Sequence, residues 1–346
     1  MKVLYVGRDF NLIDNGGSIV AKRNYDSLLR LGMTVDSLLI PPPSTTRKIW
    51  NFLLRQSYGL TSAIRRRFEI LLEDKYDFVF FDGSLYGSLL KYCHKKSMKT
   101  ICFYHNVEQI YYREKYKISK GLVDRLTIPY IIHNELISTT YATAIIVLNE
   151  RDSRALDEIY DRKSDFVFPT SFEPIKLSIA DYNVSEEYLL FVGSNFFANV
   201  EATDFILRYI APFVNCKIKI VGNVCENYIG KHIPPNVLFT GQVEDLLPYY
   251  ANALAVIAPI FSGSGLKTKT VEALRYGKTI IGTHEAFQGI DFGDDIGFLC
   301  NTSAEFIEVI NTTQFEKRNE DSLKLFERNY SNAAQIERLK GFLDSF

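Results

Sequence analysis

The sequence contains no long apolar run and no regular cysteine spacing. No stretch reaches the roughly 18 apolar residues of a membrane-spanning helix. The chain enters a strand-like run at Lys2, without the basic and apolar segments of a signal peptide, so we expect a cytoplasmic protein. Five scattered cysteines lack C-x-x-C or C-x-x-H spacing, which argues against disulfides or a zinc site and predicts reduced core residues. They are Cys93, Cys102, Cys216, Cys225 and Cys300.

Several catalytic signatures are also absent. The sequence has no G-x-S-x-G of esterases, no H-E-x-x-H of zinc peptidases and no Walker loop, which argues against those enzyme classes. The pair Asp294-Asp295 is predicted to lie in a turn rather than at a strand end. A formal net charge of -1 disfavours a nucleic-acid-binding protein.

The charge is unevenly distributed along the chain. Residues 1–170 contain 25 Lys and Arg against 19 Asp and Glu, and the remainder contains 15 against 22. The basic residues of the first half could contact an anionic membrane surface or an anionic acceptor, or they could simply form solvated helix faces. They include Arg65, Arg66, Arg67, Lys91, Lys95, Lys96 and Lys99.

Short apolar runs alternate with longer stretches of helical period, which is typical of βαβ units and a parallel sheet. At 346 residues the chain suits two domains. We therefore predict an α/β fold with two Rossmann-like domains that face a cleft. The predicted strands of the first half are 2–6, 34–40, 78–81, 100–104, 144–148 and 165–168. Those of the second half are 188–192, 217–221, 237–240, 254–259, 279–282 and 297–300.

The pattern also predicts domain boundaries. It weakens between Pro169 and Glu187, in a segment that also contains Pro174, so we expect a first domain over 1–170, a linker over 171–187 and a second domain over 188–314. Residues 315–346 read as two amphipathic helices without a strand, and we expect them to pack back on the first domain.

A helical insertion follows the break at Pro41-Pro42-Pro43. It contains the apolar residues Trp50, Phe52, Leu53 and Leu54. These side chains could seat an acceptor lipid, although simple packing against the first domain is the expected use.

The most informative window reads strand, tight loop, helix, strand over residues 254–282. Gly263 and Gly265 permit a sharp turn and close backbone approach to a ligand at the start of the helix. Lys267 and Lys269 place cations in the first turn, where the helix dipole favours anions, so a bound diphosphate would compensate them. Ordinary exposed Lys residues are the alternative interpretation.

Glu272 lies one helical turn beyond Thr268, so the two side chains share a helix face. A carboxylate there can accept hydrogen bonds from vicinal hydroxyls, such as those of a ribose. A phosphate site with a ribose site beside it would suit a nucleoside diphosphate as the ligand.

The stretch Gly263-Ser-Gly-Leu-Lys-Thr-Lys-Thr-Val-Glu-Ala-Leu-Arg-Tyr-Gly277 closely resembles the donor-binding motif of glycosyltransferase family 4. Leu190-Phe-Val-Gly-Ser-Asn195, followed by Asn199-Val-Glu-Ala202, resembles the first strand and helix of that family's donor domain. The segment from Phe239 to Ala251 resembles its loop near the nucleobase. The resemblance implies a GT-B fold, retention of anomeric configuration and no divalent metal or other cofactor.

The resemblance also implies roles for individual residues. The amides around Gly265, Leu266 and Lys267 would hold the pyrophosphate, Glu272 the ribose, and Gln242 and Val243 the base. Further donor-binding candidates on the matching motifs are Gly193, Ser194, Asn199, Ser264, Thr268 and Lys269. Many family members carry a Glu that contacts the donor sugar eight positions before the ribose Glu. Here that position is Ser264, which leaves the sugar open.

The first half supplies candidates at predicted strand ends, where open α/β sheets place their sites. Gly16 and Gly17 permit approach of an anion at a helix that Ser18 could cap. His105 could donate to developing charge or to a sugar hydroxyl, with Asn106 positioning it. A structural role is the alternative for each.

Asp82 and Ser84 also follow a predicted strand and could meet the acceptor. Asp82 could equally cap the next helix.

Together these features predict a retaining hexosyltransferase with catalytic residues His105, Lys267 and Glu272. The expected donor is a nucleoside diphosphate sugar, with UDP-sugars favoured, and the acceptor a glycan, lipid-linked or protein-linked hydroxyl, as in bacterial surface polysaccharide synthesis. Peripheral contact with the inner membrane face and homo-oligomerisation stay open. The alternatives are a non-catalytic sugar-nucleotide-binding subunit of a transferase complex and a sugar-nucleotide epimerase of the same fold.

Overall fold

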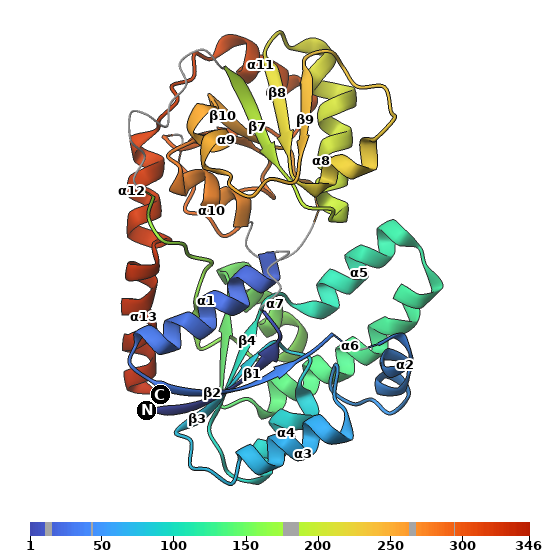
Figure 1. Cartoon of the computed structure of the whole chain (residues 1–346), viewed down its shortest axis with the longest axis vertical. Coiled ribbons are helices and arrows are strands. Elements are labelled where there is room, and N and C mark those ends of the chain that lie inside the picture. The colour runs from blue at the N-terminus through green and yellow to red at the C-terminus, as the bar shows by residue number, and fades with distance from the viewer. Residues whose placement is uncertain (11–15, 43, 176–186, 263–267, 294) are drawn as a thin grey trace. The chain divides into compact units, whose positions relative to one another are not determined.

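The computed structural model describes residues 1–10, 16–42, 44–175, 187–262, 268–293 and 295–346. It contains two six-stranded, wholly parallel sheets, and this confirms the α/β class predicted from the sequence (Figure 1). The chain divides into two compact units. The first comprises Met1–Thr170 and Gln335–Phe346, and the second comprises Ser171–Ala334.

The first sheet has the strand order β2-β1-β3-β4-β5-β6. Its strands alternate apolar side chains on both faces, because helices cover each side. Leu4 and Val6 of β1 face a core shared with α3, α4 and α7. Tyr5 faces the other side and stacks on Phe80 at 5.7 Å between ring centroids. The strands are β1 (Lys2–Arg8), β2 (Thr34–Ile40), β3 (Phe78–Asp82), β4 (Thr100–Tyr104), β5 (Ala144–Val147) and β6 (Phe166–Val167).

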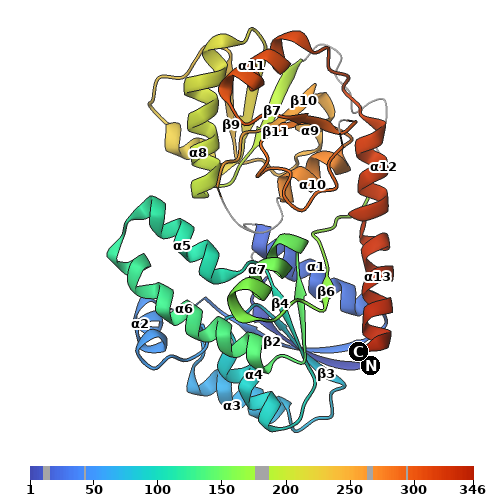
Figure 2. The ribbon, with the colours of Figure 1, turned by 180° about the vertical axis from the view of Figure 1, so that it is seen from behind.

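The helices of the first unit connect these strands. α5 and α6 pack against each other as a hairpin between β4 and β5 (Figure 2). The helices are α1 (Gly16–Arg30), α2 (Thr45–Leu53), α3 (Ser62–Leu71), α4 (Gly87–Lys95), α5 (Glu108–Ser119), α6 (Leu122–Tyr141) and α7 (Glu150–Tyr160).

The second sheet has the order β12-β11-β10-β7-β8-β9. Its strands are β7 (Tyr188–Val192), β8 (Lys217–Val221), β9 (Val237–Gly241), β10 (Ala255–Ala258), β11 (Thr279–Gly282) and β12 (Gly297–Leu299). Its α-helices are α8 (Phe197–Phe205), α9 (Leu247–Asn252), α10 (Thr268–Arg275), α11 (Ser303–Thr312) and α12 (Glu320–Asn329). The π-helix η2 (Ile206–Ile210) and the 3₁₀ helices η3 (Ala211–Phe213) and η4 (Asn223–Tyr228) complete the unit.

Each sheet contains one point where the chain reverses its direction of travel across the strands. In the first sheet this point lies between β1 and β3, and in the second it lies between β7 and β10. Loops after the carboxyl ends of such strand pairs leave the sheet in opposite directions and open a crevice for ligands. The topology therefore singles out the loops after β1, β3, β7 and β10.

The segment after residue 314 is shared between the two units. α12 packs on α10 in the second unit. The prediction from the sequence was that both terminal helices pack on the first domain. α13 (Asn332–Ser345) joins the first unit from Gln335 onward, and there Phe342 stacks on Phe166 at 4.9 Å. Residues 176–186 of the expected linker lie outside the described residues.

All five cysteines are free thiols, and four of them are buried, as expected from their scattered positions. Burial raises the pKa of the Cys93 thiol to about 12 and that of Cys300 to about 11, so both are protonated and inert at neutral pH.

Lys278 is a buried cation that ties three segments of the second unit together. Its side chain is fully buried, and Nζ donates to the carbonyls of Ala251 at 3.1 Å, Ala253 at 2.9 Å and Lys317. Burial lowers the pKa of Lys278 to about 7. The three carbonyls lie at the C-terminal end of α9 and in the segment before α12, so a single side chain satisfies acceptors that lack a partner within their helix or loop.

We expect Lys278→Met to destabilise the protein by roughly 2 to 4 kcal/mol, because buried carbonyls lose their donor. Urea unfolding measures this free energy. Lys324→Met is the matched control, because the Lys324 side chain on α12 is exposed. It should change the unfolding midpoint little. Equal midpoints for the two variants would show that Lys278 is dispensable for the fold.

Candidate functional site

The loops after β7 and β8 touch through two glycines. Gly193 N donates to Val221 O at 2.9 Å, and Val224 N donates to Gly193 O at 3.2 Å. Gly222 has φ +113, and a Cβ atom there would lie 2.2 Å from the Gly193 carbonyl oxygen. Only glycine fits at Gly222, and the close contact fixes the backbone of the β7 loop beside the reversal point.

Three of the donor-binding candidates from the sequence form one network at this point. Lys269 Nζ, at the start of α10, donates to Asn199 Oδ1 on α8. Asn199 Nδ2 in turn donates to Ser194 O at 2.9 Å, in the loop after β7. The Lys269 ammonium also lies 4.9 Å from the centroid of the Phe191 ring. Asn199 Nδ2 also lies 3.2 Å from the Ser194 hydroxyl, so the structure gathers an ammonium, an amide and a hydroxyl from the segments that follow β7 and β10.

Glu272 is half-buried one turn further along α10, on the same face as the half-buried Thr268. Burial raises the pKa of Glu272 to about 7, and this effect outweighs the lowering by Arg275, Lys269 and the Tyr250 hydroxyl. A carboxylate that has lost part of its water gains more from ligand hydroxyl donors than an exposed one does.

Gln242 and Val243 follow β9, which is the edge strand of the second sheet. Gln242 is exposed and Val243 half-buried. Gly241 turns the chain with φ +79, and its carbonyl accepts from Gly222 N at 2.7 Å. The contact between Gly222 and Gly241 therefore connects this loop to the loop after β8.

Four further candidates lie outside the described residues. They are Ser264, Gly265, Leu266 and Lys267, within the segment 263–267. The pyrophosphate loop and the catalytic role of Lys267 therefore stay predictions. Residues 11–15, which lead into Gly16 and Gly17, are also undescribed.

In the first unit, Asp82 and His105 form a buried pair at the ends of β3 and β4. His105 Nε2 lies 3.0 Å from Asp82 Oδ2, and Asn24 Nδ2 donates to Asp82 Oδ1 at 2.7 Å. The hydrogen bonds and the charge of His105 lower the pKa of Asp82, although burial opposes them. Asp82 is thus an ionised acceptor, and a neutral His105 carries its proton on Nε2.

The second ring nitrogen of His105 is buried and has no hydrogen-bond partner among the described residues. In a neutral ring with Nε2 protonated, Nδ1 is an acceptor, and in a charged ring it is a donor. A neutral His105 is thus arranged to accept a hydrogen bond from a ligand hydroxyl, and a charged one to donate it, as the sequence indicated.

Ser84 is buried and donates to Glu135 Oε1 at 3.3 Å. Glu135, on α6, also accepts from the backbone N–H groups of Glu108 at 2.7 Å and Gln109 at 3.1 Å. This carboxylate accepts hydrogen bonds from the first free amides of α5, and its negative charge interacts favourably with the positive end of the helix dipole. Glu135 was missed because it lies 27 residues from the helix that it caps.

Glu108 was also missed, although it lies only three residues after His105 in the sequence. Burial and the charge of Glu135 raise the pKa of Glu108 to about 8, while Arg8 and Asn106 lower it. Asn106 and Glu108 are both half-buried at the end of β4. Glu108 therefore adds a second titratable group beside His105.

α1 begins at Gly16. Gly17 and the buried Ser18 accordingly lie in the first turn of the helix. The expectation that Ser18 caps α1 is wrong for this reason, since a cap residue precedes the helical turn.

Two kinds of feature are absent from the described part of the chain. No three His, Cys, Asp or Glu side chains there are grouped as metal ligands would be. No described helix is long and apolar enough to cross a bilayer.

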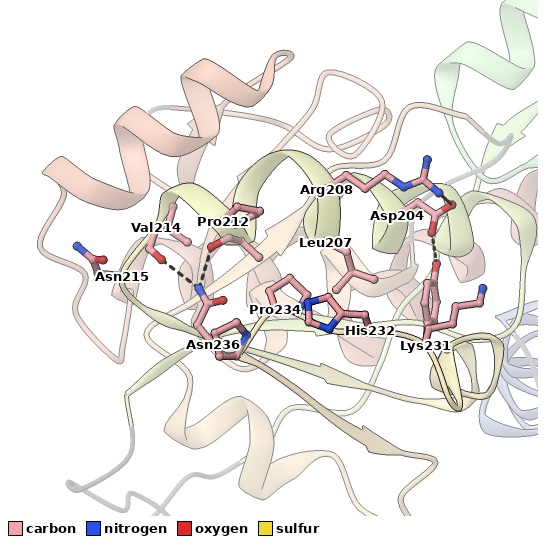
Figure 3. A pocket seen from close by; sticks show the side chains of 13 residues that line it. Asp204, Leu207, Arg208, Pro212, Val214, Asn215, Lys231, His232, Pro234 and Asn236 are labelled. Carbon is pink, nitrogen blue, oxygen red and sulfur yellow. Dashed lines mark hydrogen bonds and ion pairs between the residues drawn. The ribbon is translucent and has the colours of Figure 1, made fainter.

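A surface cavity of about 790 Å³ lies elsewhere in the second unit, between η2, η3 and the segment before β9 (Figure 3). Asn236, on its wall, donates to the carbonyls of Ala211 at 2.9 Å and Val214 at 3.0 Å. Asn215 and Asn236 precede β8 and β9, so the cavity lies at the amino ends of the strands. It is not part of the Lys269 network.

Comparison with known proteins agrees with this geometry. Solved structures of Anabaena Alr3699/HepE in complex with UDP (TM-score 0.69, 13% identity, 100% of both chains) and of WaaG (TM-score 0.67, 16% identity, 97% of this chain and 98% of that one) have the same fold. That fold is GT-B. Residues 186–313 match the family described as "Glycosyl transferases group 1".

A curated relative matches by sequence. It is the "Uncharacterized 44.6 kDa protein in cps region" of Klebsiella pneumoniae, 22% identical over 300 residues, which span 75% of this chain and 74% of that protein.

We expect ¹⁵N NMR of the histidine rings near pH 7.5 to show His105 as the Nε2–H tautomer. In Asp82→Asn the charged acceptor is gone, so His105 should exchange between tautomers. His232, on an exposed segment of the second unit, serves as the internal reference and should not change. A wild-type ring protonated on Nδ1 would contradict the assignment of Nδ1 as acceptor.

Proposed function

We propose that this protein is a glycosyltransferase that moves a sugar from a nucleoside diphosphate donor to a hydroxyl group. The observation that carries the proposal is the Lys269–Asn199–Ser194 network at the reversal point of the second sheet. It brings together residues of two separate motifs, inside the segment that matches the glycosyl transferases group 1 family.

UDP-sugars are the favoured donors. Structures of Anabaena HepE contain UDP, UDP with glucose, and UDP-glucose, and this chain shares their fold. Here Glu272 would accept from the ribose hydroxyls, and Gln242 with Val243 would flank the base. The loop 263–267 and Lys267 would neutralise the diphosphate.

The chemistry needs no covalent nucleophile. The acceptor oxygen bonds to the anomeric carbon on the face from which the diphosphate leaves, so configuration is retained. The proton of the acceptor passes to the departing phosphate oxygen. Nδ1 of His105 would accept from a donor-sugar hydroxyl and hold the ring in place, and Glu272 would act through the ribose. We expect no divalent cation to be required.

The setting we propose is bacterial surface glycan synthesis on the cytoplasmic side. WaaG is described as involved in lipopolysaccharide biosynthesis, and the Klebsiella relative is described as lying in a cps region. Both descriptions agree with a glycan or lipid-linked acceptor.

We expect one donor in a panel of UDP-, GDP-, ADP- and dTDP-sugars to raise the melting temperature and to release nucleotide slowly, with EDTA present. Glu272→Gln and Lys269→Met should each weaken binding about tenfold or more, because each removes a charged contact. Glu308→Gln, an exposed change on α11, is the control. If the wild type binds no donor, the proposal fails; binding without release of nucleotide would indicate a non-catalytic subunit.

The affinity for UDP-glucose should rise about tenfold between pH 6 and pH 8. Glu272 has a pKa of about 7, ribose hydroxyls favour its ionised form, and the diphosphate of UDP-glucose does not titrate in this range. Calorimetry across pH measures the change, and Glu272→Gln should give a flat profile. An equally steep profile in that variant would assign the titration to another group.

A further inference from the structure

α2 attaches to the first unit with polar side chains. Asn51 is 2% exposed and donates to the Leu60 carbonyl at 3.0 Å, and Arg47 Nε donates to the same carbonyl at 2.9 Å. The half-buried Phe52 lies 6.2 Å from Tyr130 of α6, between ring centroids. Among the described side chains of this helix, those of Arg47, Asn51 and Phe52 thus hold its inner side by hydrogen bonds and an aromatic contact.

The outward side of α2 is apolar. Trp50, Leu53 and Leu54 lie on one helical face and are each more than half exposed. The expectation that the apolar residues of this segment pack against the first domain is wrong for these three, whereas it holds for Phe52, which packs on Tyr130. A helix of a water-soluble surface normally has the opposite arrangement, with its apolar stripe inward, so this face lacks its partner.

A second apolar group lies at the tip of the α5–α6 hairpin. Leu122, Val123 and Leu126 begin α6 and are between 53% and 77% exposed. Both ribbon views place α2 beside α6 (Figures 1 and 2), and the Phe52–Tyr130 contact joins the two helices. We call the six residues Trp50, Leu53, Leu54, Leu122, Val123 and Leu126 the α2–α6 face.

Exposed cations surround this face. Arg55 follows α2, and Lys117, Lys120 and Arg125 lie around the hairpin tip, all exposed. The acidic residue at the tip is Asp124, whose carboxylate accepts from Lys115 at 2.8 Å and from Ser119 at 2.6 Å.

The sequence around α2 has the same bias. From 41 to 68 it contains six cations and no Asp or Glu. They are Arg47, Lys48, Arg55, Arg65, Arg66 and Arg67.

We propose that the α2–α6 face docks on the surface of an anionic phospholipid bilayer. Leucine and tryptophan side chains partition into the boundary between headgroups and acyl chains, and the surrounding cations are attracted to anionic headgroups. Tryptophan is particularly favoured at that depth. A protein partner would need its own acidic, apolar surface, whereas a bilayer supplies both properties over any area.

The position of the face suits a lipid-linked acceptor. α5 starts at Glu108, three residues after His105, and its 12 residues span about 18 Å at 1.5 Å per residue. The hairpin tip therefore lies one helix length from the strand ends that carry His105.

Trp50 is the only tryptophan of the chain, so its fluorescence reports from the face itself. Vesicles of phosphatidylcholine mixed with phosphatidylglycerol should shift its emission to the blue and bind the protein in sedimentation. Salt should weaken this binding, and vesicles of phosphatidylcholine alone should bind much less.

Two variants and a control separate the contributions. Leu53→Ser with Leu54→Ser should lower vesicle partitioning at least about tenfold. Lys117→Gln with Lys120→Gln and Arg125→Gln should lower it similarly for anionic vesicles only. Phe213→Ser with Ile229→Ser changes two exposed apolar residues of the second unit and should leave it unchanged. Circular dichroism checks that each variant folds.

The proposal is overturned if anionic vesicles leave Trp50 emission unchanged, or if the control lowers binding as much as the face variants. It is also overturned if the blue shift follows protein concentration without lipid and the protein sediments as a dimer, because a second copy then covers the face. No donor is present in these experiments, so their outcome is independent of the proposed transferase activity.

Discussion

The parallel direction of the strands determines where this protein places its chemistry. All strands of a sheet end at one edge, and a reversal of strand order opens a crevice there. In the second sheet Lys269, Asn199 and Ser194 meet beside that reversal, and they come from two motifs about 70 residues apart. Gly193 and Gly222 contribute because, without a Cβ atom at Gly222, the loops after β7 and β8 can touch. The position of Ser194 in the network therefore depends on this glycine as well as on its own hydrogen bonds.

Much of this was predictable because buried parallel strands have a distinct composition. The runs 34–40, 100–104, 188–192, 217–221 and 279–282 were predicted with the observed bounds, since each is rich in apolar residues and is followed by proline, glycine or polar residues. Less predictable were interactions between distant residues. Glu135 accepts from the first amides of α5, and Lys278 donates to three carbonyls. These partners are distant in the sequence, so no short sequence motif indicates either interaction. The prediction that the apolar residues of α2 face inward failed for a related reason. The amphipathic pattern of a helix does not show which of its faces packs on the protein.

Two carboxyl groups illustrate how similar electrostatics serve different ends. Burial raises the pKa of Glu135 and of Glu272 to about 7 in both cases. Glu135 is surrounded by donors from its own unit, including Tyr160 Oη at 2.8 Å, and its hydrogen-bonding capacity is used within the fold. Glu272 stays half-buried and retains capacity for a ligand. A shifted pKa alone therefore does not distinguish a structural group from a binding group.

The division of the chain has a consequence for the order of folding. Residues 335–346 complete the first unit, where Phe346 contacts Phe78 at 5.8 Å and Lys99 donates to the Phe346 backbone oxygen at 2.6 Å. The whole second unit is thus inserted between two parts of the first. During synthesis from the N-terminus, the inserted unit emerges complete from the ribosome before the surrounding one, and the first sheet must persist with part of its apolar face uncovered until the last helix arrives.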